Sequence, residues 1–234
     1  MRDVRLHADA VRPPGADPGR GVTVADHHEI ERTFALGRTD AAPLDVLAAV
    51  PGVADVVEPV TAELEATYVD TDDLALVRAG VTLRRRTGGA DAGWHLKVPS
   101  GQGRDEIHRP LGEDAGAVPA DLRERVEPWS GGRALAGVAV VRTHRTTYDL
   151  LDAEGAPLAE VADDVVTGEP LDGGPTTAWR ELEVELTGGD VPLLDAATEA
   201  LAAAGIEVST QPRKIEAVLA HRLLDDEAVG SDED

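Results

Sequence analysis

Two short segments with alternating side chains, 27–36 and 180–187, constrain the fold of this chain more than any other feature. The first reads HHEIERTFAL and the second RELEVELT, so that carboxylates alternate with apolar residues in both. Successive side chains of a strand point to opposite faces, and each segment therefore predicts a strand with one acidic face. Either strand alone is equally compatible with charges that face water. The recurrence of the pattern favours two walls of one acidic site, which is costly to bury unless a positive group occupies it.

Composition narrows the class of protein. The chain has 234 residues, which suits one large domain or two small ones, and its 42% hydrophobic content is sufficient for a core. It has no cysteine, so disulfides and thiolate metal sites are excluded. The net charge of −23 argues against nucleic acid or an anionic membrane as the main partner. No apolar run is long enough for a membrane span or a secretory signal, and we expect a cytoplasmic protein.

The chain divides into an arm, one domain and a tail. Residues 1–24 predict a flexible arm, 25–224 a single α+β domain, and the acidic segment 225–234 a disordered tail. Strands are predicted at 27–36, 62–70, 81–87, 94–98, 104–111, 137–151, 157–166 and 180–187. Helices are predicted at 43–50, 74–78, 119–127, 192–204 and 212–224.

Several of these strands carry basic residues on one face. Arg84 and Arg86 share a face of 81–87, Lys97 lies on the polar face of 94–98, and Arg145 belongs to 137–151. If helices cover the apolar faces, the charged faces must meet inside a barrel. An eight-stranded barrel holds packed side chains or one small ligand. The fold class predicted is therefore α+β, a closed antiparallel eight-stranded β tunnel with helices packed outside.

A cavity lined by both signs of charge favours a phosphate chain with a divalent cation. Mg²⁺ takes oxygen ligands, commonly carboxylates plus substrate phosphates, whereas arginine and lysine bind the phosphates directly. The sequence contains no P-loop, GxGxxG, GxSxG or HExxH pattern that would support a different chemistry.

The chain resembles the CYTH family, also called triphosphate tunnel metalloenzymes. The family opens with an ExExK strand, which corresponds here to Glu29–Thr33 (EIERT). Further similar motifs follow in family order: YVDTDDLALVRAGVTLRRR at 68–86, WHLKVP at 94–99, RTTY at 145–148, ELEVEL at 181–186 and RKIEAVL at 213–219. The resemblance covers residues 27–221, and five motifs in order are far more specific than ExEx alone.

The resemblance implies an eight-stranded tunnel that binds Mg²⁺ or Mn²⁺ and acts on a small-molecule triphosphate or polyphosphate. The metal ligands that it implies are Glu29, Glu31, Asp164, Glu181, Glu183 and Glu185, with Asp163 as the alternative to Asp164 if the register slips by one residue. The phosphate-binding bases are Arg84, Arg86, Lys97, Arg142, Arg145 and Lys214. The residues expected to act in catalysis are Glu29, Glu31, Lys97 and Glu183.

One position departs from the family pattern. Thr33 replaces the lysine of ExExK, and its hydroxyl carries no charge. The leading hypothesis is metal-dependent hydrolysis of a triphosphate, either inorganic tripolyphosphate or an organic one. Two alternatives stay open: cyclisation of ATP by an adenylate cyclase of this family, and a noncatalytic polyphosphate- or nucleotide-binding module, which Thr33 makes plausible. The sequence determines neither the substrate nor the oligomeric state.

Overall fold

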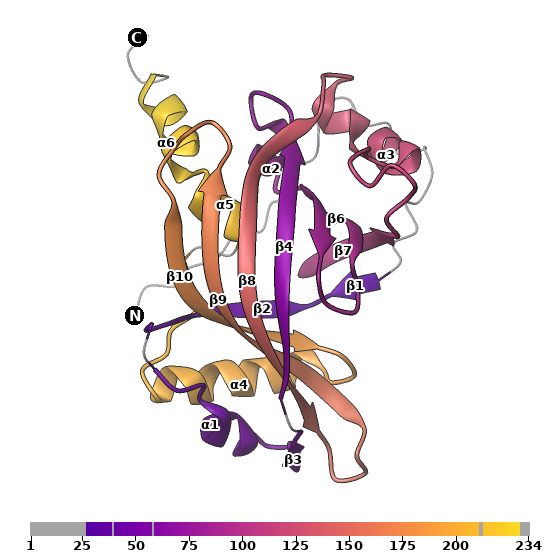
Figure 1. Ribbon diagram of the computed structural model, residues 1–234. Helices are drawn as coiled ribbons and strands as arrows, with labels where there is room; N and C mark the ends of the chain where they lie inside the picture. The colour runs from indigo at the N-terminus through magenta and orange to yellow at the C-terminus, as the bar shows by residue number, and fades with distance from the viewer. Residues whose placement is uncertain (1–26, 39, 58, 211–212, 230–234) are drawn as a thin grey trace.

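The computed structural model describes residues 27–38, 40–57, 59–210 and 213–229, which form a curved antiparallel sheet with helices around it (Figure 1). The arm predicted at 1–24 lies outside the described residues. The strands are β1 His27–Glu29, β2 Glu31–Leu36, β3 Asp55–Val56, β4 Val60–Asp70, β5 Thr82–Thr87, β6 Gly93–Ser100, β7 Gly103–Arg109, β8 Ala136–Leu151, β9 Pro157–Pro170 and β10 Thr177–Leu186. The helices are α1 Leu44–Ala48, α2 Ala75–Arg78, α3 Ala120–Ser130, α4 Val191–Ala203, α5 Lys214–Val218 and α6 Ala220–Val229.

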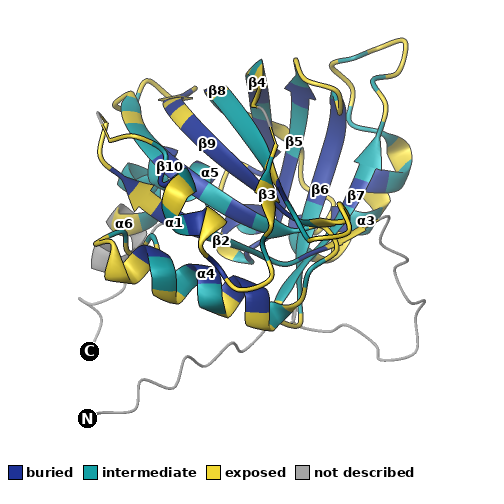
Figure 2. Cartoon of the chain, turned by 90° about the horizontal axis from the view of Figure 1, so that it is seen from below, coloured by how far each residue is buried: buried dark blue, intermediate teal, exposed yellow. Residues whose placement is uncertain are grey.

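The sheet curls into a nearly closed barrel. Its strands follow the order β1-β7-β6-β5-β4-β8-β9-β10-β2, and β3 pairs with β8 off this path. Strands β1 and β2 are the two edges of this sheet, yet only Ile30 separates them in the chain. The two edges are therefore joined through one residue, whose carbonyl accepts a hydrogen bond from the Leu186 amide at 3.0 Å. The curl of the sheet is visible from below in Figure 2.

Gly103 is required where β1 meets β7. A Cβ at this position would lie 2.0 Å from the carbonyl oxygen of Glu29. A side chain would thus force the two strands apart, and only glycine permits this approach. The contact matters for the site because it fixes the backbone that carries Glu29.

Helices cover two areas of the outer face. Helices α1 and α4 pack over β2, β9 and β10, in a core that includes Phe34, Val161, Leu182 and Leu194. Helices α2 and α3 pack over β5, β6 and β7, in a core that includes Leu83, Leu96, Ile107, Leu122 and Val126. Figure 2 shows α4 lying across the curved sheet at the first of these areas. No helix among the described residues is long and apolar enough to cross a membrane.

Helix α5 packs on the inner face of the barrel. Its Ile215 and Val218 belong to a core with Val141 and Val166. Val141 is four residues before Arg145 on β8, so the two side chains share a face, and that face lines the cavity described below. One end of the barrel interior is thus filled by α5, and the prediction that the helices pack outside does not hold for this helix.

The fold class is confirmed, but some boundaries differ from the prediction. The first acidic strand is interrupted at Ile30, and the short strand β3 has no predicted counterpart. The helix predicted at 212–224 is broken at Leu219 into α5 and α6. Helix α6 then continues to Val229, so the first residues of the tail predicted to be disordered are helical. Residues 230–234 lie outside the described part.

Candidate active site

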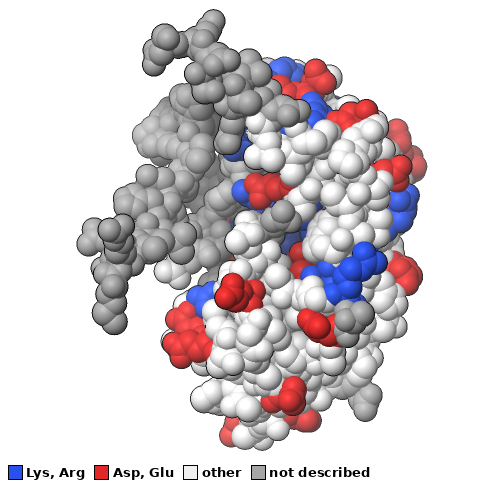
Figure 3. All heavy atoms as spheres, turned by 90° about the vertical axis from the view of Figure 1, so that its left-hand side faces the viewer, with Lys and Arg blue, Asp and Glu red and all other residues white. Residues whose placement is uncertain are grey.

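The inner face of the barrel encloses a charged cavity of about 250 Å³. Seven carboxylates and seven lysine or arginine side chains line it together with His27, so that the two signs balance inside a chain of net charge −23. The carboxylates are Glu29, Glu31, Asp91, Glu106, Glu160, Glu183 and Glu185, and the bases are Arg84, Arg86, Lys97, Arg104, Arg145, Arg213 and Lys214. By contrast, charged side chains of both signs are scattered over a mostly uncharged surface on the face shown in Figure 3.

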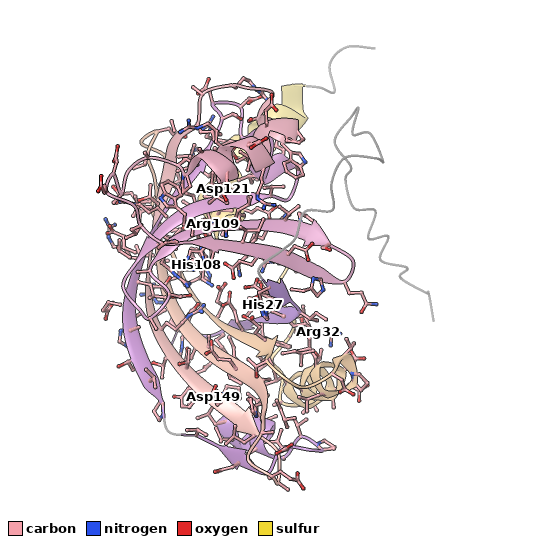
Figure 4. All side chains as sticks on the ribbon, turned by 90° about the vertical axis from the view of Figure 1, so that its right-hand side faces the viewer. His27, Arg32, His108, Arg109, Asp121 and Asp149 are labelled. Carbon is pink, nitrogen blue, oxygen red and sulfur yellow. The ribbon has the colours of Figure 1, made fainter. Side chains whose placement is uncertain are left out.

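The view in Figure 4 looks onto the concave side of the sheet. His27 lies near the middle of this side, below the β6–β7 hairpin, and Asp149 lies farther down. The charged side chains of the cavity come from β1, β2, β5, β6 and β7 and from β8, β9 and β10, with others from the turn after β5 and from Arg213 and Lys214. The β5–β7 wall lies above His27, and the long strands β8, β9 and β10 form the wall behind and below it.

Strands β5, β6 and β7 form a wall with an apolar outer face and a charged inner one. Arg84 is the register partner of His95, and Lys97 is the partner of Glu106. The residues of opposite parity, such as Leu83 and Leu96, are fully buried beneath α2 and α3. Simple alternation therefore directs the bases inward, because the outer face is sealed by helices.

The guanidinium groups of β5 are incompletely neutralised. Arg84 donates a hydrogen bond to the Tyr68 hydroxyl at 3.2 Å, and it forms no salt bridge within the described residues. Arg86 pairs with Asp91, whose side chain is more than half exposed. Burial, and then repulsion by Arg84 and Arg145, lowers the pKa of Arg86 to about 10. This part of the cavity therefore favours an anion.

Glu29 lies at the centre of a buried polar network. Its Oε2 is 2.5 Å from Nζ of Lys97. Burial, with a hydrogen bond to Glu106, raises the pKa of Glu29 to about 7. On the far side of Glu106, its Oε1 lies 2.7 Å from Nδ1 of His95, while Nε2 of His95 donates to the Asp91 carbonyl. Because that carbonyl can only accept, a further proton lies between His95 and Glu106.

A second group of carboxylates surrounds an internal ammonium. Nζ of Lys214 lies 2.9 Å from Asp164 and 2.6 Å from Glu183, and it also contacts Glu181. Arg145 donates to both oxygens of Asp164, at 2.8 and 2.6 Å, and to Glu183 at 2.5 Å. We call Asp164, Glu181, Glu183 and Lys214 the Lys214 cluster.

The charges of the Lys214 cluster stabilise one another. Burial opposes the charge on Lys214, but the surrounding carboxylates outweigh it and raise the pKa of Lys214. Burial likewise acts to raise the pKa of Glu183, but Lys214 and Arg145 hold that pKa well below its usual range. At neutral pH the ammonium and the Glu183 carboxylate are therefore both charged.

A third group of carboxylates is open to the cavity. Glu31 on β2 is the register partner of Glu185 on β10, which is in turn the partner of Glu160 on β9. Register partners in antiparallel strands have Cα atoms about 4.5–5.5 Å apart. We call Glu31, Glu185 and Glu160 the carboxylate row.

The carboxylate row has few cationic partners. Glu31 pairs with Arg104, and Glu185 lies 3.8 Å from Nε2 of His27. Neither Glu185 nor Glu160 forms a salt bridge with a lysine or an arginine in the part of the chain that the structure describes. Burial, together with nearby Glu185 and Asp149, raises the pKa of Glu160 even though Arg145 opposes the shift.

The two acidic groups differ in their fit to a metal ion. Oxygen atoms of Asp164, Glu181 and Glu183 lie within 4.8 Å of one another, which is close enough to share an ion. Lys214 contacts all three of them, so a cation already compensates this group. The carboxylate row offers three oxygen-donor side chains with no ammonium among them, the ligand type that Mg²⁺ and Mn²⁺ prefer. By ligand type the row therefore suits a divalent cation, whereas among the described residues the three carboxylates whose oxygens already lie within 4.8 Å of one another are those of the Lys214 cluster.

The structure brings most of the predicted site residues together. Nine of them line the cavity from strands or from the start of α5, and Asp164 and Glu181 are buried beside it in the Lys214 cluster. Seven of the nine are Glu183 and Glu185 of β10, Arg84 and Arg86 of β5, Lys97, Arg145 and Lys214. The predicted pair Glu29 and Glu31 lines it as well, from the two sides of Ile30.

Alternation along the strands shows that two candidate site residues, Arg142 and Asp163, face away from the cavity. Arg142, predicted as a phosphate ligand, lies on the outer surface, where it pairs with Glu65 and Glu169 at 2.9 and 3.2 Å. It is three residues from Arg145 on one strand, so the two must face opposite sides. Asp163 also faces outward and binds Arg180 at 2.6 Å, which leaves Asp164 as the inward residue.

The sequence analysis missed five charged lining residues: Asp91 in the turn after β5, and Arg104, Glu106, Glu160 and Arg213. Arg104 and Glu106 alternate with Asp105 on a predicted strand, and Glu160 has the parity of Asp164, so alternation contained a signal for these three. Arg213 opens the RKIEAVL motif just before α5, but nothing in that motif indicated that its side chain lines the cavity.

Comparison with known protein families shows to which family this chain belongs. A model of the CYTH domain family matches residues 27–216, and the chain belongs to this family. Two uncharacterised proteins from strains of Mycobacterium tuberculosis are 38% identical to it over 210 residues. The match includes 83% of this chain and 40% of each relative, so the chain spans less than half the length of these relatives.

Among solved structures, a candidate adenylate cyclase from Bacillus halodurans resembles this chain with a TM-score of 0.53 at 18% identity. The alignment covers 81% of this chain and 96% of that one. A protein from Hippeastrum, described as a candidate adenylyl cyclase with a dominant triphosphatase activity, has a TM-score of 0.46 at 18% identity over 83% and 95% of the two chains. At these identities the likeness to the first structure shows the fold alone.

Proposed function

We propose that this protein hydrolyses a triphosphate with the help of Mg²⁺ or Mn²⁺. The observation that carries the proposal is the incompletely neutralised guanidinium pair of β5, Arg84 and Arg86, opposite carboxylates that no ammonium occupies. A buried cation without a partner is costly, and a phosphate chain would supply the missing negative charge.

The two walls of the cavity have separate roles. Arg84, Arg86, Lys97 and Arg145 bind and orient the phosphates. The carboxylate row, together with Glu29, would hold the divalent cation, which supplies positive charge to the phosphate oxygens when it is bound. Within the Lys214 cluster, Asp164 and Glu181 keep Lys214 and Arg145 in place rather than binding metal. This assignment narrows the predicted set of metal ligands to Glu29, Glu31 and Glu185, which lie outside the Lys214 cluster.

Catalysis in this scheme depends on positioning and electrostatics. Water attacks the terminal phosphorus in line, the bond to the bridging oxygen breaks, and the shortened phosphate chain leaves with that oxygen. Glu183 is a charged hydrogen-bond acceptor inside the cavity and would orient the attacking water, whose proton passes to a phosphate oxygen because Lys214 and Arg145 keep the pKa of Glu183 well below its usual range. Lys97, 2.5 Å from Glu29, would move toward the phosphates when the metal takes over that carboxylate.

Release of phosphate from tripolyphosphate with Mg²⁺ or Mn²⁺ tests the proposal. We expect turnover by the wild-type chain and a loss of about 100-fold or more in Glu31→Ala, because that carboxylate lies in the row. Glu169→Ala, on the outer surface of β9, is the matched control and should retain the wild-type rate. No turnover by the wild type would reject hydrolysis, and equal rates of turnover in the two variants would reject the row as the metal site.

A noncatalytic binding module is the second candidate, and Thr33 favours it, because a hydroxyl stands where the family carries a cation. Tight, metal-dependent binding of tripolyphosphate without turnover would support this candidate, as would gain of activity in Thr33→Lys. The name of the Bacillus halodurans structure adds cyclisation of ATP, so cyclic AMP should be assayed beside phosphate. We retain the predicted cytoplasmic location as part of the proposal.

A further inference from the structure

The turn between β5 and β6, residues 88–92, places Asp91 at the charged cavity. The Asp91 carboxylate pairs there with the guanidinium of Arg86. Both ends of the turn are anchored: a Cβ at Gly88 would lie 1.9 Å from a carbonyl oxygen of β4, and Nε2 of the buried His95 donates to the Asp91 carbonyl at 2.9 Å. The backbone of Asp91 is therefore held in place, and its side chain is the part that can move.

The pair of Asp91 with Arg86 differs from the most strongly held ion pair of the cavity. Arg145 donates from Nε and Nη2 to the two oxygens of Asp164, which is fully buried. Arg86 contacts Asp91 through Nη2, while its Nε is buried and has no hydrogen-bond partner within the described residues. The Asp91 side chain is also 56% exposed, so its carboxylate can turn into water and remain hydrated. The pair of Asp91 with Arg86 is therefore easily opened, because an exposed ion pair holds its partners weakly.

The donor that Asp91 occupies is one that an incoming anion needs. Arg84 and Arg86 share a face of β5, and Nε of Arg84 is likewise buried without a hydrogen-bond partner within the described residues. Phosphate and carboxylate groups bind a guanidinium best through two parallel N–H bonds, as Asp164 binds Nε and Nη2 of Arg145. Nη2 of Arg86 is one of the two donors of such a fork. A phosphate oxygen and the Asp91 carboxylate therefore compete for the same N–H group.

We propose that Asp91 is an internal competitor for the anion site at Arg84 and Arg86, and that its carboxylate leaves Arg86 when a phosphate binds. The proposal rests on the proposed function in so far as it assumes a phosphate ligand. Every anion that contacts Arg86 must find the pair open, so its affinity is reduced in proportion to the fraction of molecules in which the pair is open. A chain of phosphates regains affinity from Arg84 and Arg145 together, whereas a single phosphate reaches fewer of these groups. Asp91 thus favours polyphosphate over orthophosphate and helps the orthophosphate product to leave.

Three variants separate competition from a general effect of charge. Asp91→Asn removes the competing charge at nearly constant size, and Asp91→Glu keeps the charge. The matched control is Glu65→Gln, because Glu65 is a similarly exposed carboxylate on the neighbouring strand β4, and its register partner Thr87 adjoins Arg86. The Glu65 side chain lies on the outer face, where it pairs with Arg142. Glu65→Gln therefore removes a charge near the same part of β5 without opening the Arg86 pair.

The test measures dissociation constants by calorimetry on the full chain with Mg²⁺, for the bis-methylene analogue of tripolyphosphate and for inorganic phosphate. We expect Asp91→Asn to tighten binding of both anions by about tenfold, which corresponds to a pair that is closed about 90% of the time in the wild type. Asp91→Glu and Glu65→Gln should change either constant by less than about twofold.

Unchanged or weaker binding in Asp91→Asn would overturn the proposal, because weaker binding would mean that Asp91 holds Arg86 in position for the ligand. Equal tightening in Glu65→Gln would overturn it as well, since the loss of a negative charge would then explain the gain. Absence of binding of either anion to all of these proteins would contradict both this proposal and the proposed function. Because the analogue is not hydrolysed, a wild type that binds it but does not turn over tripolyphosphate would reject the proposed function alone.

Discussion

The Lys214 cluster and the carboxylate row each contain three carboxylates on neighbouring strands. Cations neutralise the negative charge of the cluster far more completely than that of the row. In the cluster, Lys214 contacts three carboxylates and Arg145 binds two of them. In the row, Glu31 pairs with Arg104, and within the described residues the ionic partner of Glu185 is the His27 ring alone, at 3.8 Å. An acidic pattern in a strand therefore does not define a metal site by itself. What matters is whether the fold delivers a cation to it.

The difference follows from where α5 packs. This helix has five residues, too few to be stable alone, and it is held by the burial of Ile215 and Val218 on the inner face of the barrel. That packing places Lys214, its first residue, among Asp164, Glu181 and Glu183. The row lies farther from α5 and receives no such side chain. We therefore expect the cluster to contribute mainly to stability and the row mainly to metal binding.

The largest effect expected is on stability, in Lys214→Met. This change leaves Asp164 and Glu183 with Arg145, and Glu181 with the indole N–H of Trp179, and removing one member of a buried ion pair costs about 3–5 kcal/mol. Denaturant unfolding of the two proteins measures this loss in the free energy of unfolding. Arg222→Met is the control, because its partner Asp172 is 3.6 Å away at the surface, and such pairs contribute about 0–1 kcal/mol.

The effect of Mn²⁺ on the melting temperature gives a second comparison of the wild type with Lys214→Met. Once the ammonium is removed, oxygens of Asp164, Glu181 and Glu183 within 4.8 Å of one another become free to share an ion. The ion should then raise the melting temperature of Lys214→Met by more than it raises that of the wild type. Equal shifts in the two proteins would mean that Lys214 does not keep metal out of the cluster.

The second prediction concerns activity, in Glu185→Gln. Since Glu185 has no lysine or arginine partner within the described residues, the change should leave the free energy of unfolding almost unaltered, while it removes a metal ligand. We expect a loss of about 100-fold in tripolyphosphate hydrolysis, which corresponds to about 2.7 kcal/mol in the barrier. Steady-state rates measured against metal concentration would reveal it. A wild-type metal dependence in Glu185→Gln would show that the row does not bind the ion.

Sequence alternation predicted most of this interior because each strand has one face sealed by an apolar core. Leu83 and Leu96 must pack under helices, so Arg84 and Lys97 have only the inside of the barrel left to them. The same reasoning failed where the strand was interrupted. Nothing local in HHEIERTFAL indicates that the chain changes its pairing partner at Ile30, because that change is set by closure of the whole barrel.

The sequence also did not predict which of the two acidic groups is neutralised by a lysine. Lys214 was recognised as a candidate base, but its role depends on α5 turning into the barrel, a choice made by contacts with distant strands β8 and β9. The ion pairs of Glu29 with Lys97 and of Glu31 with Arg104 likewise join segments about 70 residues apart in the numbering. The sequence thus indicates which charges enter the cavity, and the tertiary structure determines which of them remain uncompensated.

The smallest effect expected is that of Arg142→Ala, which tests whether parity alone separates surface from site. Arg142 is half exposed on the outer face and pairs with Glu65 and Glu169, so its removal should lower the free energy of unfolding by no more than about 1 kcal/mol. Hydrolysis of tripolyphosphate should stay within about twofold of the wild type, because no phosphate in the cavity can contact this guanidinium. Arg145→Ala, three residues along the same strand, should by contrast lose most of the activity in the same assay. A comparable loss in both variants would mean that Arg142 reaches the substrate, and the separation of β8 into an inner and an outer face would have to be revised.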